Sequence, residues 1–171
     1  MKLVGVDDLN LKMRNALILY GAAPADVTME FSNDFYAYNA KHVIGYTVLK
    51  YEHDDDEFLK WCKILFQYEP YDEIDDFLLA LLHEVGHLNT YGLIPEEAKQ
   101  EDKINRQQIE EAIKENKGTS LNYYSLPLER WATKWATDFI KKNKHLYWLL
   151  KENVIEILDN FYSENTEEIG D

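Results

Sequence analysis

Two histidines and a glutamate stand close together in the segment His83-Glu84-Val85-Gly86-His87, which matches the pattern H-E-x-x-H. On a helix, residues four apart share a face, so both imidazoles could reach one zinc ion at about 2.0–2.1 Å. In a strand the same spacing would separate them by more than about 10 Å. The pattern therefore predicts a metal-binding helix, on which Glu84 would act as the general base of a hydrolytic reaction.

A hydrolytic zinc site needs a third protein ligand, and the residues next to the motif do not supply one. Leu93 stands where a longer metalloprotease pattern places its third histidine. The candidates farther along the chain are Glu96, Glu97, Glu101, Glu129 and His145. Glu129 is the best placed, because the small side chains of Ala132 and Ala136 would let its helix approach the motif helix closely.

The patterns around these residues predict the elements that would position them. Apolar residues at helical spacing predict helices over about 7–20, 55–67, 73–89, 96–117, 125–142 and 145–162. Three short runs rich in β-branched and aromatic residues, between Val27 and Tyr51, predict antiparallel strands. The predicted fold class is therefore α+β. It is a small zincin-like domain with a short three-stranded antiparallel sheet, about five to six helices and an active-site helix that carries the motif.

The predicted motif helix separates its apolar residues from its candidate ligands. Its apolar face consists of Ile74, Phe77, Leu78, Leu81, Leu82, Val85 and Leu88. His83, Glu84 and His87 project from the other side. Gly86 lies inside this helix, where glycine costs about 1 kcal/mol relative to alanine. That cost predicts that another backbone or a substrate comes close to the helix at Gly86.

Length and charge limit the classes of protein that fit. The chain has 171 residues, which predicts a single domain over 1–171 with a frayed acidic tail at about 163–171. It has 18 Lys and Arg against 32 Asp and Glu, for a net charge of −14. A surface with this much negative charge repels phosphate backbones and anionic lipids. We therefore expect no direct nucleic-acid partner.

The sequence also predicts a cytoplasmic protein with no membrane association. The single cysteine, Cys62, cannot form an internal disulfide. The first residues lack the apolar region of a signal peptide. The longest apolar run, Phe77–Leu82, has six residues, whereas a bilayer span needs about 20.

Two segments together resemble a known family. The segment LLHEVGH, followed some forty residues later by ERWATKWA, is similar to the ImmA/IrrE family of HExxH metallo-endopeptidases, which is common in phages and other mobile elements of bacteria. Its members typically carry L-x-H-E-[LIV]-G-H and then E-x-x-A-[ND]-x-[FW]-A. The resemblance implies that His83 and His87 bind zinc, that Glu84 is the catalytic glutamate and that Glu129 is the third ligand.

The chain departs from the family pattern at two places. Thr133 stands where the family usually has Asn or Asp, so Asp138 is considered as a substitute partner for the histidines. The polar helix at 96–117 also lengthens the interval between the motifs. Side chains with the chemistry to stabilise an oxyanion are Tyr91, Tyr123, Tyr124 and His145.

The predicted function is that of a zinc-dependent metallo-endopeptidase that cleaves a protein or peptide substrate. A strand within His42–Tyr51 would hold the substrate by β-addition. The alternative is a catalytically inactive zincin-fold interaction module that docks through the acidic helix at 96–117. An acidic protein that mimics DNA is a third reading, in which the two matched motifs would be coincidental. Oligomeric state and the identity of the divalent metal stay open.

Overall fold

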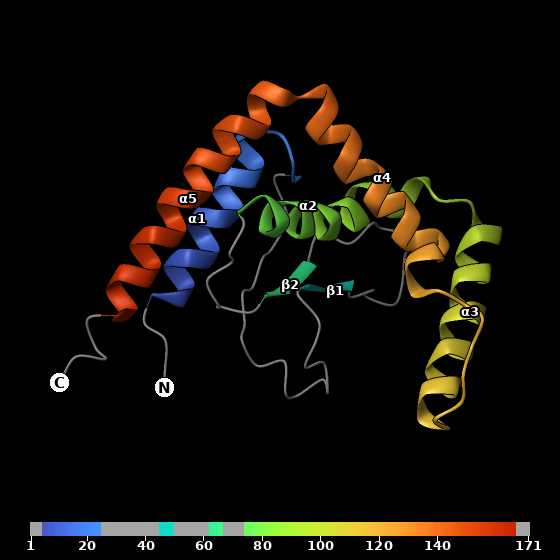
Figure 1. Ribbon diagram of the computed structural model, residues 1–171. Helices are drawn as coiled ribbons and strands as arrows, with labels where there is room; N and C mark the ends of the chain where they lie inside the picture. Colours follow the sequence, from blue (N-terminus) through green and yellow to red (C-terminus); the bar gives the residue numbers. More distant parts are fainter. Residues whose placement is uncertain (1–4, 25–44, 50–61, 67–73, 167–171) are drawn as a thin grey trace, which may run out of the picture.

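The computed structural model describes residues 5–24, 45–49, 62–66 and 74–166 (Figure 1). These residues form the helices α1 (Val6–Leu19), α2 (Ile74–Thr90), α3 (Glu96–Lys114), α4 (Pro127–Lys142) and α5 (Lys144–Thr166). They also form the strands β1 (Gly45–Leu49) and β2 (Cys62–Phe66) and two single 3₁₀ turns, η2 (Tyr91–Leu93) and η3 (Tyr123–Ser125). The described part of the chain is therefore mainly helical.

The predicted fold class, α+β with a three-stranded sheet, is wrong for this structure. The described residues contain one antiparallel pair, in which Gly45 lies opposite Phe66 and Leu49 opposite Cys62. β2 lies where a helix over 55–67 was predicted. A short apolar run of this kind fits either element, and here the pairing with β1 decides. The other two strands predicted between Val27 and Tyr51 fall outside the described residues.

The other helices surround α2 (Figure 1). α1 and α5 run side by side at one end of the molecule, and α4 crosses α2. α3 packs against α4 at the opposite end, and β1 contacts α2. α5 continues past Tyr162 to Thr166, so helix replaces part of the predicted frayed tail. None of the helices in the described segments combines the length and the apolar character that crossing a bilayer requires.

The apolar core joins α2 to α1 and α5. The buried apolar side chains of α2 are Phe77, Leu78, Leu81, Leu82, Val85 and Leu88, and those of α1 and α5 are Leu9, Met13, Ala16, Leu17, Leu150, Val154, Ile157 and Phe161. The predicted apolar face of α2 is confirmed, because six of its seven residues are buried and Ile74 packs against the cluster. Burial of this face fixes the rotation of α2 about its own axis, and so fixes where His83 and His87 point.

Candidate metal centre

The side of α2 that faces away from this core is also covered, because α4 crosses it at Gly86. A Cβ atom added to Gly86 would lie 2.6 Å from the carbonyl oxygen of Ala132 and 3.0 Å from its Cα. Real side chains do not tolerate such distances, so only glycine allows this crossing. The predicted close approach of another backbone at Gly86 is confirmed, and the other backbone is that of α4.

One face of α4 meets α2, and it begins with the candidate third ligand. Glu129, Ala132 and Ala136 are all buried, at intervals of three and four residues. Phe139 continues the same face into the core. Trp131, the neighbour of Ala132, lies off this face and is 38 % exposed. The two small alanines therefore bring α4 close to α2, as expected, without help from Trp131.

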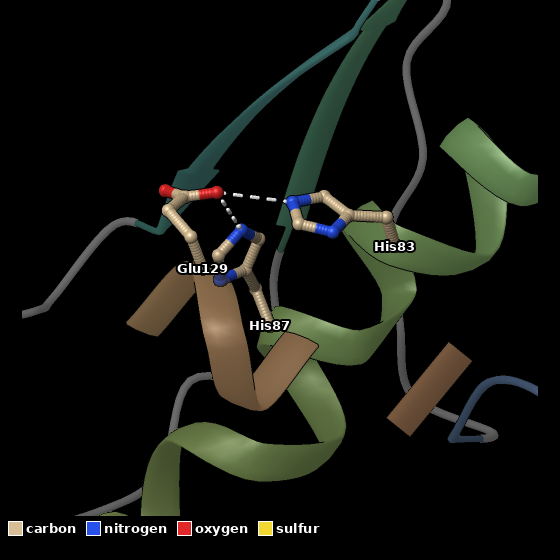
Figure 2. A group of neighbouring side chains, drawn as sticks. All are labelled: His83, His87 and Glu129. Atoms are coloured by element: carbon tan, nitrogen blue, oxygen red, sulfur yellow. Dashed lines mark hydrogen bonds and ion pairs between the residues drawn. The ribbon is translucent and has the colours of Figure 1, made fainter. Parts of the chain in front are cut away.

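The crossing brings two histidines and a glutamate together (Figure 2). Oε2 of Glu129 lies 3.0 Å from Nε2 of His83 and 3.4 Å from Nε2 of His87. The two imidazole rings stand edge to face, with centroids 4.9 Å apart. One ligand atom from each of the three residues lies within 4.8 Å of the other two. The three side chains thus form a group that could bind a metal ion.

The group fits a zinc-like divalent cation in both chemistry and spacing. Imidazole nitrogens and a carboxylate oxygen are common zinc ligands, and atoms about 2.0–2.1 Å from a tetrahedral ion lie about 3.3 Å from one another. The distances of 3.0 and 3.4 Å from Glu129 to the histidines are close to that value. The set offers three protein ligands, which is the number found in catalytic zinc sites that keep one position open.

Thr133 orients His83 from the side away from Glu129. Its Oγ1 lies 3.1 Å from Nδ1 of His83, so the two ring nitrogens of this histidine contact two residues of α4. Thr133 follows Glu129 by four residues and therefore shares its face of the helix. Although Thr133 stands where the similar family usually has Asn or Asp, its hydroxyl still gives His83 a hydrogen-bonding partner.

Asp138, which we considered as the partner of the histidines, lies on another face of α4. It follows Thr133 by five residues, a rotation of about 140°. Its carboxylate pairs instead with Lys134 at 2.8 Å and with Lys142 at 3.4 Å. The prediction for Asp138 is therefore wrong about what its side chain contacts.

α3 contributes two charged residues to the centre. Nη2 of Arg106 lies 3.0 Å from Oε1 of Glu129, the carboxylate oxygen that does not face the histidines. Asp102, which is 2 % exposed, accepts a hydrogen bond from Nε of Arg106 at 3.1 Å. Nη1 of Arg106 donates to the hydroxyl oxygen of Tyr123 at 2.6 Å. Glu129 is therefore contacted at both carboxylate oxygens, by the two histidines at Oε2 and by Arg106 at Oε1.

These contacts shift the proton affinities of the buried groups. Burial alone would raise the pKa of Glu129, but hydrogen bonds from His83, His87 and Arg106 hold it far below its usual range. The pKa of His83 is raised. Burial alone would lower it, but the hydrogen bond to Glu129 and the negative charges of Glu84 and Glu129 outweigh burial. Glu129 is therefore ionised near neutral pH, which is the form that binds a metal.

Glu84 and Tyr123 shift in the opposite sense from Glu129. Glu84 is 8 % exposed, and burial raises its pKa even though the two neighbouring histidines oppose the change. Burial and the charge of Glu129 raise the pKa of Tyr123 to about 12, against the opposing effect of Arg106. Glu84 thus accepts a proton more readily than an exposed carboxylate, and Tyr123 keeps its hydroxyl proton.

The remaining predicted site residues lie elsewhere. Tyr124 is 78 % exposed and contacts the centre only through the ring of Tyr123 among the contacts described. His145 lies in the first turn of α5, beyond the end of α4, whereas Glu129 lies in the first turn of α4, so about 20 Å of α4 separates Glu129 from the end of the helix that precedes His145. Glu96 forms an ion pair with Lys99, and Glu97 and Glu101 are exposed. Of the third-ligand candidates, Glu129 is the one that meets the histidines.

The sequence interpretation missed Arg106 and Asp102. Both lie on the narrow buried stripe of α3 with Ile109, because positions 102, 106 and 109 recur at helical spacing. An aspartate on the inward face of an otherwise polar helix was the available signal. It was hidden because α3 contains many other charged residues, most of them exposed.

Comparisons with protein-family models, with curated proteins and with solved structures found no match for this chain.

Proposed function

We propose that this protein is a zinc-dependent metallo-endopeptidase similar to the ImmA/IrrE family, with His83, His87 and Glu129 as metal ligands and Glu84 as general base. The observation that carries the proposal is the convergence of the three ligand atoms from α2 and α4 within 4.8 Å. A bound divalent ion supplies a Lewis acid that activates a water molecule and polarises the scissile carbonyl. The order of the residues along α2 and the first turn of α4 agrees with the H-E-x-x-H and distal-glutamate pattern.

Glu84 moves the proton in this proposal. It lies next to His83 on α2 and close enough to both histidines and Glu129 for their charges to act on it. Its buried carboxylate accepts a proton from the attacking water and returns it to the leaving amine, so that one peptide bond and one water become a carboxylate and an amine. Glu84 is not a ligand, so metal binding does not depend on it.

Tyr123 is the electrophilic group of the proposed site. Its hydroxyl oxygen accepts a hydrogen bond from Arg106, and its own proton is directed to the Glu129 carboxylate. To stabilise an oxyanion, the hydroxyl would turn from Glu129 to the substrate oxygen. Tyr123 as a whole residue is 41 % exposed, so a substrate can reach it. Of the four oxyanion candidates in the sequence, Tyr123 is the one that the structure joins to the ligand group through Arg106.

The peptide substrate is held by β1 in this proposal. β1 contacts α2, the helix that carries His83 and His87. Within the described segments β1 pairs with β2 alone, so its second edge has no strand partner there. An extended peptide can add to such an edge by backbone hydrogen bonds.

Replacement of Glu84 by glutamine tests the catalytic part of the proposal. We expect Glu84→Gln to lower turnover by about 10²–10⁴-fold and to leave bound zinc at about one ion per chain. New protein amino termini in a bacterial lysate, identified by mass spectrometry, report cleavage, and elemental analysis reports zinc. Glu110→Gln, on the exposed side of α3, is the matched control. Equal cleavage by wild type and Glu84→Gln would refute the proposal, and zinc binding without any cleavage by wild type would favour the inactive interaction module.

Tyr123→Phe tests the oxyanion role. Removal of this one hydroxyl should lower kcat by about 10²–10³-fold, which is typical of an oxyanion donor, with little change in KM. The measurement uses a peptide that spans a cleavage site found in the lysate. Tyr124→Phe is the control, because Tyr124 projects into solvent. If the two variants have the same kcat, Tyr123 has no part in catalysis.

A further inference from the structure

Two charged residues of α3 are turned toward the first turn of α4 rather than toward solvent. Asp102 is 2 % exposed, and Arg106 follows it by one helical turn. Oδ2 of Asp102 accepts a hydrogen bond from the backbone nitrogen of Leu128 at 2.9 Å. The residue before α4, Leu126, has no side chain that can cap a helix. Asp102 therefore caps α4 from another helix and fixes where its first turn begins.

The guanidinium of Arg106 makes contacts in three directions. Nε and Nη2 both lie 3.1 Å from Oδ1 of Asp102. Nη2 also lies 3.0 Å from Oε1 of Glu129, and Nη1 donates to Tyr123. A planar guanidinium with this many partners has one preferred orientation, which a flexible ammonium would not have. The two residues of α3 therefore form a rigid support beneath Glu129.

We propose that Arg106 is a positioning residue for Glu129, and that Asp102 holds Arg106 in place. Arg106 occupies Oε1, so Glu129 offers the histidines Oε2 alone. A carboxylate restricted in this way binds an ion through one oxygen and leaves a coordination position open for water. This inference rests on the proposed metal site. It assigns to α3 a direct part in that site, where the sequence suggested a docking surface.

Metal affinity and coordination number test the inference. We expect Arg106→Gln to weaken zinc binding by about 10–100-fold, as is typical when the partner of a metal ligand is lost. The affinity is measured by competition with a chromogenic chelator. In the cobalt-substituted protein, the visible bands should weaken, because the freed Oε1 allows Glu129 to bind through both oxygens and raises the coordination number. Arg130→Gln is the matched control, since Arg130 is the exposed neighbour of Glu129 in the sequence.

A second pair of variants keeps the test informative if Arg106→Gln does not fold. Asp102→Asn/Arg106→Gln removes both charges together and so avoids an unpaired buried carboxylate, while the introduced amide still offers an oxygen to the backbone nitrogen of Leu128. We expect the same cobalt spectrum as for Arg106→Gln. Arg106→Lys retains the charge but not the planar fork, and should restore only part of the affinity.

The result that would overturn the inference is distinct from one that would overturn the metal site. If wild type binds zinc, and Arg106→Gln or the double variant matches Arg130→Gln in affinity and cobalt spectrum, Arg106 does not position Glu129. If wild type binds no more zinc than His83→Ala, the metal site itself is wrong. If zinc binds and the spectrum changes as expected but no substrate is cleaved, the positioning role stands and the peptidase activity does not.

Discussion

The two sides of α2 are buried by different means. On one side, leucine, valine and phenylalanine side chains pack against α1 and α5. On the other, α4 crosses at Gly86 and encloses His83, His87 and Glu129, which Arg106 of α3 supports. Apolar burial is nondirectional and roughly proportional to area, whereas a buried charge must find a partner of the right geometry.

This difference shows that the residues that stabilise the fold are separate from the residues of the candidate metal centre. The apolar side sets the rotation of α2, but none of the hydrogen bonds and ion pairs described at the candidate metal centre involves a residue of that side. The polar side can then use close backbone contact and paired charges to hold three ligand atoms at short range. Changes on the apolar side should therefore affect folding and not metal binding, and changes on the polar side should affect metal binding more strongly.

The largest effect on stability is expected from Leu81→Ala. Leu81 is fully buried and precedes His83 by two residues, so it lies on nearly the opposite side of α2. The cavity and the lost apolar burial should reduce the free energy of unfolding by about 2–5 kcal/mol, measured by urea denaturation. The folded fraction should bind zinc with unchanged affinity.

The control for Leu81 is a leucine without a packing role. Leu19 is 72 % exposed, and Leu19→Ala should change the free energy of unfolding by no more than about 0.5 kcal/mol. A loss of zinc affinity in folded Leu81→Ala would mean that the two sides of α2 are coupled, against the separation described above.

An intermediate effect is expected from Gly86→Ala, which tests the crossing itself. The added methyl group would meet the backbone of Ala132, so α4 must move away and the free energy of unfolding should fall by about 1–3 kcal/mol. Because Glu129 moves with α4, zinc affinity should fall as well, by about tenfold or more. Chelator competition and urea denaturation measure the two effects.

Gly118→Ala is the matched control, because a Cβ atom at Gly118 meets nothing within 4 Å. A stable Gly86→Ala protein with wild-type zinc affinity would show that the close crossing does not position Glu129.

The smallest effect is expected at an exposed ion pair between the apolar-side helices. Asp75 of α2 accepts hydrogen bonds from Lys151 at 2.7 Å and from Tyr147 at 2.6 Å, which lower its pKa. Lys151→Gln should reduce the free energy of unfolding by less than about 1 kcal/mol at neutral pH, since solvent screens the pair.

The pH dependence of this effect has a definite sign. A carboxyl with a lowered pKa stabilises the fold above its unfolded pKa of about 3.9, and the contribution is lost as pH falls through the lower folded value. The difference between wild type and Lys151→Gln should therefore be present at pH 7, shrink below about pH 4 and shrink in high salt. A difference that is the same at pH 7 and in strong acid would show that the ion pair is not its source.

Local sequence patterns were enough to predict the α-helices that the structure describes, though not β2, and the meeting of the candidate ligands. Helical spacing predicted α1, α2, α3 and α4 nearly at their observed bounds, because proline and acidic residues mark several starts. The spacing of His83 and His87 fixes their common face on any helix. Gly86 and the alanines of α4 predicted the close crossing that brings Glu129 to them.

What the sequence could not provide depends on contacts between distant segments. β2 forms because Cys62–Phe66 pairs with Gly45–Leu49, and its local pattern fits a helix equally well. The roles of Arg106 and Asp102 depend on where α3 packs against α4, which no local pattern states. Asp138 does not replace the Asn or Asp of the family pattern, because it lies about 140° around α4 from Thr133 and pairs with Lys134 and Lys142.

Anomalous diffraction at the zinc absorption edge tests the central claim most directly. Crystals of the protein supplied with one equivalent of zinc should show one anomalous peak per chain, about 2.0–2.1 Å from Nε2 of His83, Nε2 of His87 and Oε2 of Glu129. Oε1 of Glu129 should stay on Arg106. A map with no peak among these three residues, or with zinc bound elsewhere on the acidic surface, would contradict the account.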